Sequence, residues 1–320
     1  MKKIYLFLII FIGFILFMFM LLHNKNNIQK VFYYDKENNL ITEKTENLMF
    51  LNFLYFNKFG VYLKPIFIQK FMSKLMGFYQ DSYLSKYQIK SFIKKHDINM
   101  FEFSKSENEY KNFNDFFIRE LKPNIRTIDN DINTIIAPAD SKLFVIPDIS
   151  QDTEFFVKNI KFNLNIFLNN NELAKKYDNG LILIFRLSPS DYHRFHTPFD
   201  CIILEAKNIN GNLESVNSLV YKSGLQPLYT NERKLITLNS ELFGSVLFIP
   251  VGAMFVGKIV NTYKSNRAYK KGEEIGYFKF GGSTIVLVFE KNKIKVKDKF
   301  LTNSKNGYET QVKIGDVITG

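Results

Sequence analysis

The chain has few of the residues from which metal and redox sites are built. Its 320 residues include one cysteine, Cys201, four histidines and no tryptophan. A single cysteine cannot form an intrachain disulfide, and it cannot supply the several thiolates of a structural zinc site. Histidine chemistry is confined to His23, His96, His193 and His196. We therefore expect no metal centre.

Acidic residues are outnumbered, with 31 Asp and Glu against 43 Lys and Arg and a formal charge of +12. A surplus of basic residues implies attraction to an anionic partner but does not identify that partner. The sequence contains no helix-turn-helix, zinc-finger or RNP pattern, so we expect no nucleic-acid partner and favour an anionic lipid surface. A hydrophobic content of 46% predicts a compact body and excludes a disordered chain.

The N-terminus contains one long apolar run, from Ile4 to Leu22. Its length of about 19 residues gives about 28 Å of helix, enough to cross a bilayer. The residues that follow are not the small ones of a signal-peptide cleavage site, which favours a retained anchor. We expect residues 1–23 to be a transmembrane anchor in a bacterial cell membrane, followed by a linker over 24–47. Lysines on both sides of the run leave the membrane face open.

Residues 48–112 are expected to form a helical, membrane-associated region. Apolar positions recur at helical spacing over residues 48–93, with Gly60 and Pro65 as breaks, which predicts two or three amphipathic helices. The apolar residues between 66 and 78 suit an interfacial helix on a membrane and equally suit a helix packed on the core.

The chain beyond Thr134 has the pattern of a β-rich body. Short β-branched and aromatic runs, such as residues 181–187, 245–251 and 285–289, are separated by Gly, Pro, Asn and Asp. No long helix-period segment separates them, which argues against a doubly wound parallel sheet. We predict an α+β fold, with a mostly antiparallel catalytic domain over residues 113–320.

Two of the four histidines lie in one short segment, SPSDYHRFHTPFD, over residues 188–200. The segment follows a buried-strand pattern, and functional residues concentrate in such connections. Taken alone, His193 and His196 are more often packing or surface residues than catalysts.

Two further segments contain polar residues next to predicted strands. Asp140 follows a proline turn and precedes a strand, and Ser283 follows Gly281 and Gly282 where another strand begins. By itself the first is a turn aspartate, and the glycine pair marks a bulge or tight turn.

Together, Asp140, His196 and Ser283 could form a charge-oriented triad, which suggests a hydrolase. However, a nucleophile elbow needs a glycine two residues after the serine and a helix behind it. Here Ile285 occupies that position and a strand follows. The triad therefore points to a different use of the serine.

In several segments taken together, the chain closely resembles phosphatidylserine decarboxylases. The segments that carry the resemblance, in order, are FNDFFIRELKPNIRTID (113–129), residues 137–140, 191–198 and 231–233, VGAMFVGKI (251–259) and KGEEIGYFKFGGST (271–284). Ser141 departs from the family, which usually has a glycine after the aspartate, and Met254 and Phe255 fill positions that vary among its branches.

The resemblance implies a proenzyme that cleaves its own Gly282–Ser283 bond. It assigns self-processing to Asp140, His196 and Ser283 and places His193 in the active site. Ser283 becomes a pyruvoyl group, which forms a Schiff base with the serine amine of phosphatidylserine, and no metal takes part. The products are phosphatidylethanolamine and carbon dioxide.

The same resemblance implies the partners of the chain. The large and small cleavage fragments form a heterodimer, and pairing of such heterodimers is left open. The substrate lies in an anionic membrane. Arg194 is the first candidate for the lipid phosphate because a guanidinium fork suits phosphate oxygens, and further candidates are Arg119, Lys122 and Arg126.

Two alternatives remain at this stage. One is a membrane-bound serine hydrolase that uses the same triad without cleavage. The other is a non-enzymatic lipid-binding relative that has lost processing. The departure at Ser141 is the reason to consider it.

Overall fold

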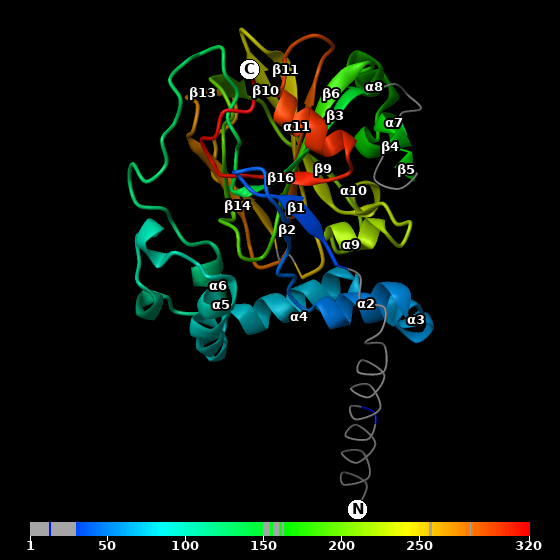
Figure 1. Ribbon diagram of the computed structural model, residues 1–320, viewed down its shortest axis with the longest axis vertical. Coiled ribbons are helices and arrows are strands. Elements are labelled where there is room, and N and C mark those ends of the chain that lie inside the picture. Colours follow the sequence, from blue (N-terminus) through cyan, green and yellow to red (C-terminus); the bar gives the residue numbers. More distant parts are fainter. Residues whose placement is uncertain are drawn as a thin grey trace, which may run out of the picture.

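The computed structural model in Figure 1 describes Gly13 and residues 30–149, 154–155, 160–161, 163–255, 258–281 and 283–320. The predicted transmembrane run at residues 4–22 lies outside the described residues, apart from Gly13. Within the described part of the chain, no helix is both long enough and apolar enough to cross a bilayer.

An 11-stranded sheet forms the centre of the molecule (Figure 1). Its strands follow the order β13 (Arg267–Tyr269), β8 (Cys201–Ile203), β10 (Arg233–Ser240), β11 (Gly244–Val251), β15 (Ser283–Phe289), β6 (Gly180–Leu187), β3 (Ser141–Ile149), β16 (Glu309–Val312), β1 (Phe32–Tyr34) and β2 (Leu40–Thr42), and β9 (Lys207–Ile209) pairs with β10. The strand pairs are antiparallel except for β1 with β16. The predicted antiparallel α+β body is confirmed.

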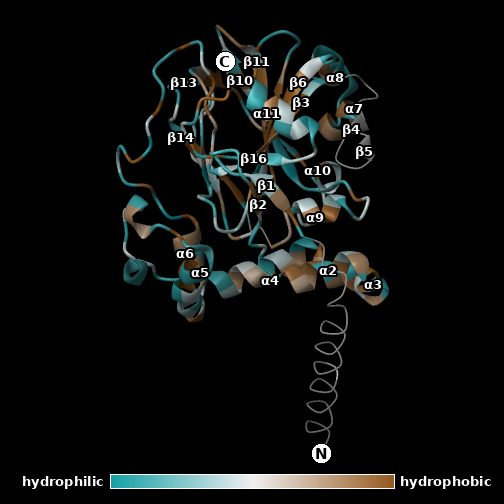
Figure 2. Ribbon diagram, viewed as in Figure 1, coloured by the Kyte–Doolittle hydropathy of each residue, from teal (hydrophilic) through white to brown (hydrophobic). Residues whose placement is uncertain are grey.

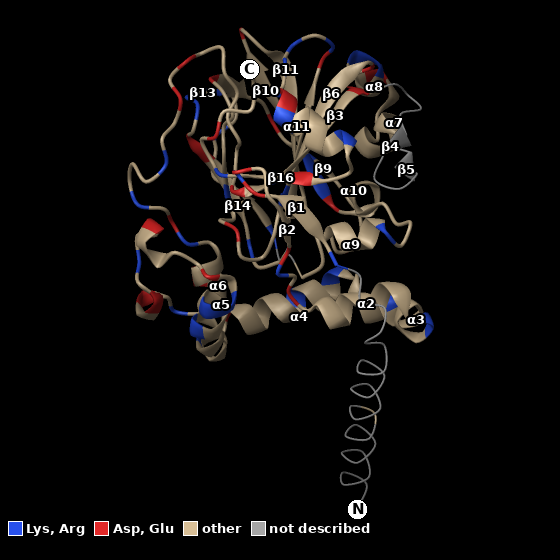
Figure 3. Ribbon diagram, viewed as in Figure 1, with Lys and Arg blue, Asp and Glu red and all other residues tan. Residues whose placement is uncertain are grey.

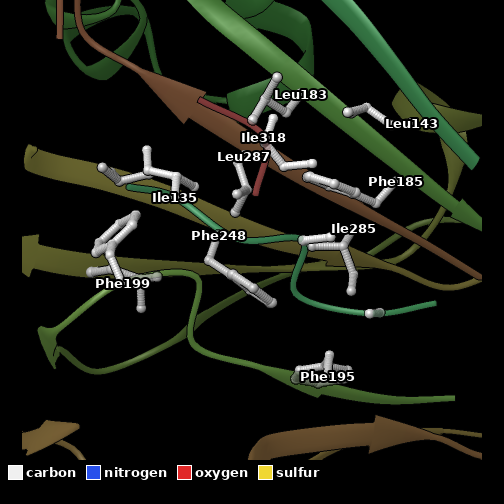
Figure 4. Close-up of a cluster of buried hydrophobic side chains, with 14 of the residues drawn as sticks. Ile135, Leu143, Leu183, Phe185, Phe195, Phe199, Phe248, Ile285, Leu287 and Ile318 are labelled. Carbon is white, nitrogen blue, oxygen red and sulfur yellow. The ribbon is translucent and has the colours of Figure 1, made fainter. Parts of the chain in front are cut away.

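Both faces of this sheet are buried at its central strands, which explains the continuous apolar strand patterns. In β15 the side chains of Ile285 and Leu287 enter one core, which Figure 4 shows with side chains of β6 and β11 around it. Val286 and Val288 point to the other face and enter a second core. Successive strand side chains point to opposite faces, so a strand covered on both sides is apolar at every position.

Different elements cover the two faces. A three-stranded sheet of β12 (Ile259–Asn261), β14 (Glu274–Phe278) and β7 (Arg194–His196) packs on the first core through side chains such as Phe195 and Phe278. Short helices cover the second core, mainly α7 (Leu164–Leu168), α8 (Asn171–Lys176) and α10 (Pro227–Thr230). The sheet body also contains α9 (Ser218–Tyr221), α11 (Asp298–Lys305) and the two-stranded pair β4 (Glu154–Phe155) and β5 (Ile160–Lys161).

A layer of helices lies at one end of the sheets (Figure 1). It contains α2 (Leu48–Phe56), α3 (Lys58–Phe67), α4 (Lys70–Asp81), α5 (Gln88–His96) and α6 (Phe113–Phe117), with 3-10 turns η2 (Tyr83–Tyr87), η3 (Met100–Glu102) and η4 (Glu107–Glu109). The prediction that Gly60 and Pro65 separate the helices is wrong, because both lie within α3. Gly60 instead allows α2 and α3 to touch, since a Cβ there would lie 1.9 Å from the carbonyl oxygen of Phe53.

The segment predicted as a linker contains two strands of the main sheet. β1 pairs with β16 through Tyr33 and Glu309, and β2 returns alongside β1 as a hairpin. Glu43 follows β2 directly and is buried. Residues 32–43 are therefore part of the sheet, on the opposite side of β6 from β15.

Candidate active site

Ser283 is the first residue of the central strand β15 and is completely buried. It pairs with Leu187 of β6, and Thr284 pairs with Val251 of β11, so strands on both sides fix its backbone. Gly281 precedes it with a φ of +133°, a conformation that residues with a side chain rarely adopt. The sequence thus places a glycine in a conformation that glycine adopts readily, just before a serine whose backbone is fixed by two strands.

His193 is the histidine that contacts this hydroxyl. Its Nδ1 lies 3.3 Å from the Ser283 Oγ, and its Nε2 lies 3.0 Å from the carbonyl oxygen of Ser188. The Phe117 ring of α6 stacks on the imidazole at a centroid distance of 3.9 Å. Three neighbours, from β15, α6 and the connection after β6, therefore fix the position of His193.

The partners of His193 determine its tautomer. A carbonyl oxygen only accepts hydrogen bonds, so Nε2 carries the proton and Nδ1 presents a lone pair to the Ser283 hydroxyl. Burial lowers the pKa of His193 well below its usual 6.5, and the nearby Arg119 lowers it further. The ring is therefore neutral at pH 7 and can accept a proton from Ser283.

His196 lies three residues along but has other partners. Its Nδ1 is 3.0 Å from the carbonyl oxygen of Gly272, and its Nε2 is 3.1 Å from the hydroxyl of Tyr192. Burial lowers the pKa of His196 to about 4. Among the described residues, His196 forms no hydrogen bond with Ser283 or Asp140.

Asp140 lies immediately before β3 and has its own fixed contacts. One oxygen accepts a hydrogen bond from the backbone amide of Ile314 at 2.9 Å, and the other pairs with the guanidinium of Arg126 at 3.1 Å. Burial raises the pKa of the Asp140 carboxyl, although Arg126 acts in the opposite direction. Ser141, the departure from the family pattern, has no positive φ and begins β3 in regular pairing with Val312.

Arg194, the first candidate for phosphate binding, is engaged by carboxylates. Its guanidinium pairs with Glu274 at 3.0 Å and Glu120 at 2.8 Å, and its Nε donates to the carbonyl oxygen of Ile118. Arg126 is similarly paired, with Glu102 and Asp140. Arg119 is buried and holds the carbonyl oxygens of Ser190 and Asp191.

A cavity of about 460 Å³ reaches the glycine turn before Ser283. Its walls come from the helical layer, the Glu43 to Asn47 segment and the end of β6, and they include Gly281. Apolar lining residues are Phe50, Leu51, Met76, Phe92, Phe113, Met254, Phe255 and Phe280. Polar ones include Glu43, Gln80, Arg186 and Ser188. The cavity offers room for a molecule with a polar end and an apolar end.

Three site residues were not found from the sequence, namely Glu43, Arg186 and Ser188. They form one buried hydrogen-bonded group beside the cavity. The arginine within the apolar run LILIFRL was the available signal, because a buried charge requires a partner. The partner could not be located, since Glu43 lies 143 positions away in a segment interpreted as a linker.

Comparison with known proteins places this arrangement in a family. The sequence model described as phosphatidylserine decarboxylase matches residues 113–320. The chain belongs to the phosphatidylserine decarboxylase family. Among similar relatives, the phosphatidylserine decarboxylase proenzyme of Fusobacterium nucleatum is 43% identical over 292 residues, covering 91% of this chain and 97% of the relative. The proenzyme of Clostridium tetani is 42% identical over 287 residues, covering 90% and 97%.

The site fits the cofactor of this family, a pyruvoyl group made from a serine. The group would replace Ser283 itself, so β15 anchors it without a separate binding site. The buried Thr284 Oγ1 has no hydrogen-bond partner among the described residues and lies next to it in sequence. Among the same residues, no group of three or more His, Cys, Asp and Glu side chains could hold a metal ion.

Proposed function

We propose that the chain severs its own backbone before Ser283 and then uses the pyruvoyl group that replaces this serine to decarboxylate phosphatidylserine. The observation that carries the proposal is the buried Ser283 hydroxyl, 3.3 Å from a neutral histidine and two positions after Gly281 with its positive φ. A hydrolase would need the hydroxyl to meet an external substrate. Here it points to a buried ring, and family membership supports neither the hydrolase nor the non-enzymatic alternative.

Cleavage begins when the Ser283 oxygen attacks the carbonyl carbon of residue 282 while a base removes the hydroxyl proton. The amide bond between residues 282 and 283 then becomes an ester, and loss of the Ser283 Cα proton breaks that ester, separates the two fragments and leaves dehydroalanine. Its imine tautomer adds water and loses ammonia, which gives the pyruvoyl group. The flanking glycines keep Cβ atoms away from the path of attack. The family resemblance assigns the base to His196, oriented by Asp140.

The contacts of the two histidines define two routes for the proton. His193 can accept it directly, since Nδ1 already faces the hydroxyl. His196 can accept it only after exchanging its Tyr192 contact for Ser283. We retain Asp140, His196 and Ser283 as the processing residues and propose that His193 holds the hydroxyl before the reaction. Direct transfer to His193 is the alternative that the 3.3 Å contact favours.

The pyruvoyl ketone, once formed, supplies an electron sink for the bond that breaks when carbon dioxide leaves. The chain itself places and shields that site. His193 stays beside position 283 with Phe117 stacked on it, and the strands around β15 exclude water. We propose that His193 or His196 returns the proton to the substrate carbon.

The two fragments are expected to remain together as a heterodimer. The small fragment, residues 283–320, contributes β15 to the middle of the main sheet, between β11 and β6 of the large fragment. Its side chains fill both cores, so its removal would expose most of the apolar interior. The break in the chain therefore lies at a strand end and leaves the fold intact.

The helical layer is proposed to receive the lipid from a membrane. The exposed side chains Phe59, Tyr62 and Ile66 of α3 and Phe71, Leu75 and Phe78 of α4 form an apolar face. Figure 2 shows hydrophobic colouring along these helices, and Figure 3 shows blue Lys residues among it, which suit an anionic surface. The same α4 lines the cavity through Met76 and Gln80. An anionic membrane against this face would present its lipids beside the cavity.

Purified protein incubated with phosphatidylserine vesicles tests the activity. We expect release of carbon dioxide and formation of phosphatidylethanolamine by the wild-type chain, and neither product from Ser283→Ala. Equal activity in both proteins would refute the assignment of Ser283. Failure of a fully cleaved wild-type protein to release carbon dioxide would refute the proposed reaction.

A further inference from the structure

A buried arginine stands next to the strand position that pairs with Ser283. Arg186 precedes Leu187 in β6, and its side chain is almost completely buried. Its Nε donates to both carboxylate oxygens of Glu309, at 2.7 and 3.0 Å. A guanidinium removed from water in this way needs acceptors for its N–H groups, and carboxylates also balance its charge.

Glu43 supplies the second carboxylate from the N-terminal hairpin. Its two oxygens accept from Nη1 and Nη2 of Arg186, both at 3.0 Å, in the bidentate geometry that carboxylates and guanidinium groups favour. The hydroxyl of Ser188 donates to the same Glu43 carboxylate and accepts from Nη1 of Arg186 at 3.2 Å. The Ser188 hydroxyl thus both donates to and accepts from this ion pair.

Ser188 is held at its backbone as well. Its amide donates to Asp191 at 2.7 Å, and Asp191 is paired with the buried Lys142. Its carbonyl oxygen accepts the Nε2 proton of His193 at 3.0 Å. Because that carbonyl selects the tautomer of His193, the direction in which it points decides whether Nδ1 presents a lone pair to Ser283.

We propose that Glu43 is a positioning residue for His193, acting through Ser188, so that the N-terminal hairpin forms part of the processing site. This inference rests on the proposed function. Glu43 lies outside the residues that the family model matches, and nothing in its local sequence marks it as part of a site.

The charges of the network agree with a fixed, ionised Glu43. Burial alone would raise the pKa of its carboxyl, but Arg186 and Lys142 lower it to about 2. The carboxylate therefore stays charged at pH 7. Glu43→Gln would keep the size of the side chain but replace one carboxylate oxygen with an NH₂ group. That group is a donor, whereas both oxygens of Glu43 now accept hydrogen bonds from Arg186 and Ser188. Glu43→Asp would keep the charge with a shorter reach.

The first experiment follows processing of the full chain in a cell-free translation, using a pulse of labelled amino acid and denaturing gels. We expect Glu43→Gln to slow cleavage about tenfold or more, because small displacements of a reacting group cost about that much. Glu43→Asp should recover part of the rate. The control is Lys36→Ala, which removes an exposed contact of the same hairpin with Asp316 and should process at the wild-type rate.

The outcomes separate this inference from the proposed function. If the wild-type chain is not cleaved, the proposed function fails. If the wild-type chain is cleaved and Glu43→Gln keeps the same rate, only the positioning role of Glu43 is overturned. The role also fails if Lys36→Ala slows cleavage as much as Glu43→Gln, since docking of the hairpin would then explain both.

The second experiment measures the tautomer of His193 directly, in a protein that cannot be cleaved. Nitrogen-15 spectra of histidine-labelled Ser283→Ala protein should show His193 with its proton on Nε2. Adding Glu43→Gln should mix the two tautomers while cooperative unfolding persists. An unchanged Nε2 signal would contradict the inference, and so would a protein that no longer folds, since that result indicates a purely structural role.

Discussion

The Nδ1 of His193 and the Oγ of Ser283 lie 3.3 Å apart, although 90 positions separate them in the chain. His193 directly precedes β7 of the small sheet, and Ser283 begins β15 of the large one. The packing of the two sheets on a shared core therefore brings the His193 ring and the Ser283 hydroxyl together. The site depends on tertiary packing and not on a local motif.

Substitution of each histidine separates the two proton routes. His196→Ala should leave the chain uncleaved if His196 is the processing base, with a loss of about 100-fold or more in cleavage rate. His193→Ala should then cleave more slowly but still mature, and its mature form should be impaired in decarboxylation. Pulse labelling with denaturing gels measures the first effect, and carbon dioxide release measures the second. Normal maturation of His196→Ala together with a stalled His193→Ala would transfer the base role to His193.

Asp140→Asn should stall processing and destabilise the fold moderately. The substitution removes the charge that pairs with Arg126, although Glu102 still neutralises that guanidinium. We expect a loss of about 1–3 kcal/mol in unfolding free energy, as for a buried polar group that loses a charged partner. Urea unfolding in a Ser283→Ala background measures this loss. Glu102→Gln is the matched control, because it removes the other carboxylate of Arg126 and should leave processing intact.

Acidification should destabilise the protein between pH 6.5 and about 4. The folded-state pKa of His196 is about 4, whereas the unfolded chain titrates near 6.5. The unfolded state therefore binds more protons in this window, so stability falls as the pH falls, by at most about 1.4 kcal/mol per pH unit for each such histidine. Unfolding of Ser283→Ala across this range tests the slope. Its His196→Gln derivative should show a smaller slope, and an identical slope would contradict burial of a neutral His196.

The proposed membrane face can be tested with a single fluorophore, because the chain contains no tryptophan. Phe78→Trp places the reporter in α4, where the native side chain is 76% exposed. In vesicles with brominated acyl chains, we expect strong quenching and a blue shift of its emission. Leu242→Trp is the control, since it lies in the turn between β10 and β11, at the end of β11 away from Met254 and the helical layer. Equal quenching of the two reporters would contradict the proposed face.

The sequence predicted the β-rich body well and the helical layer only coarsely. The strands at 181–187, 245–251 and 285–289 were recognised because both faces of the sheet are buried, which makes them apolar throughout. Gly60 and Pro65 were misinterpreted as breaks. Local propensity cannot show that a glycine inside α3 allows contact with α2, because that requirement comes from tertiary packing.

For the site, the sequence predicted residues but not their contacts. Asp140, His193, His196 and Ser283 stay predictions as site residues, and the pairing of Ser283 with His193 depends on how the two sheets pack. Glu43 was missed for a related reason. Its partner Arg186 lies in another strand, and no spacing rule connects a hairpin at one edge of a sheet with a strand near its centre.

Intact-mass measurement of the purified protein under denaturing conditions tests self-cleavage before Ser283 most directly. We expect two polypeptides, one of residues 1–282 and one of residues 283–320, the smaller of which begins with a pyruvoyl group in place of Ser283 and resists Edman sequencing. A single active polypeptide of 320 residues with an unmodified Ser283 would contradict it.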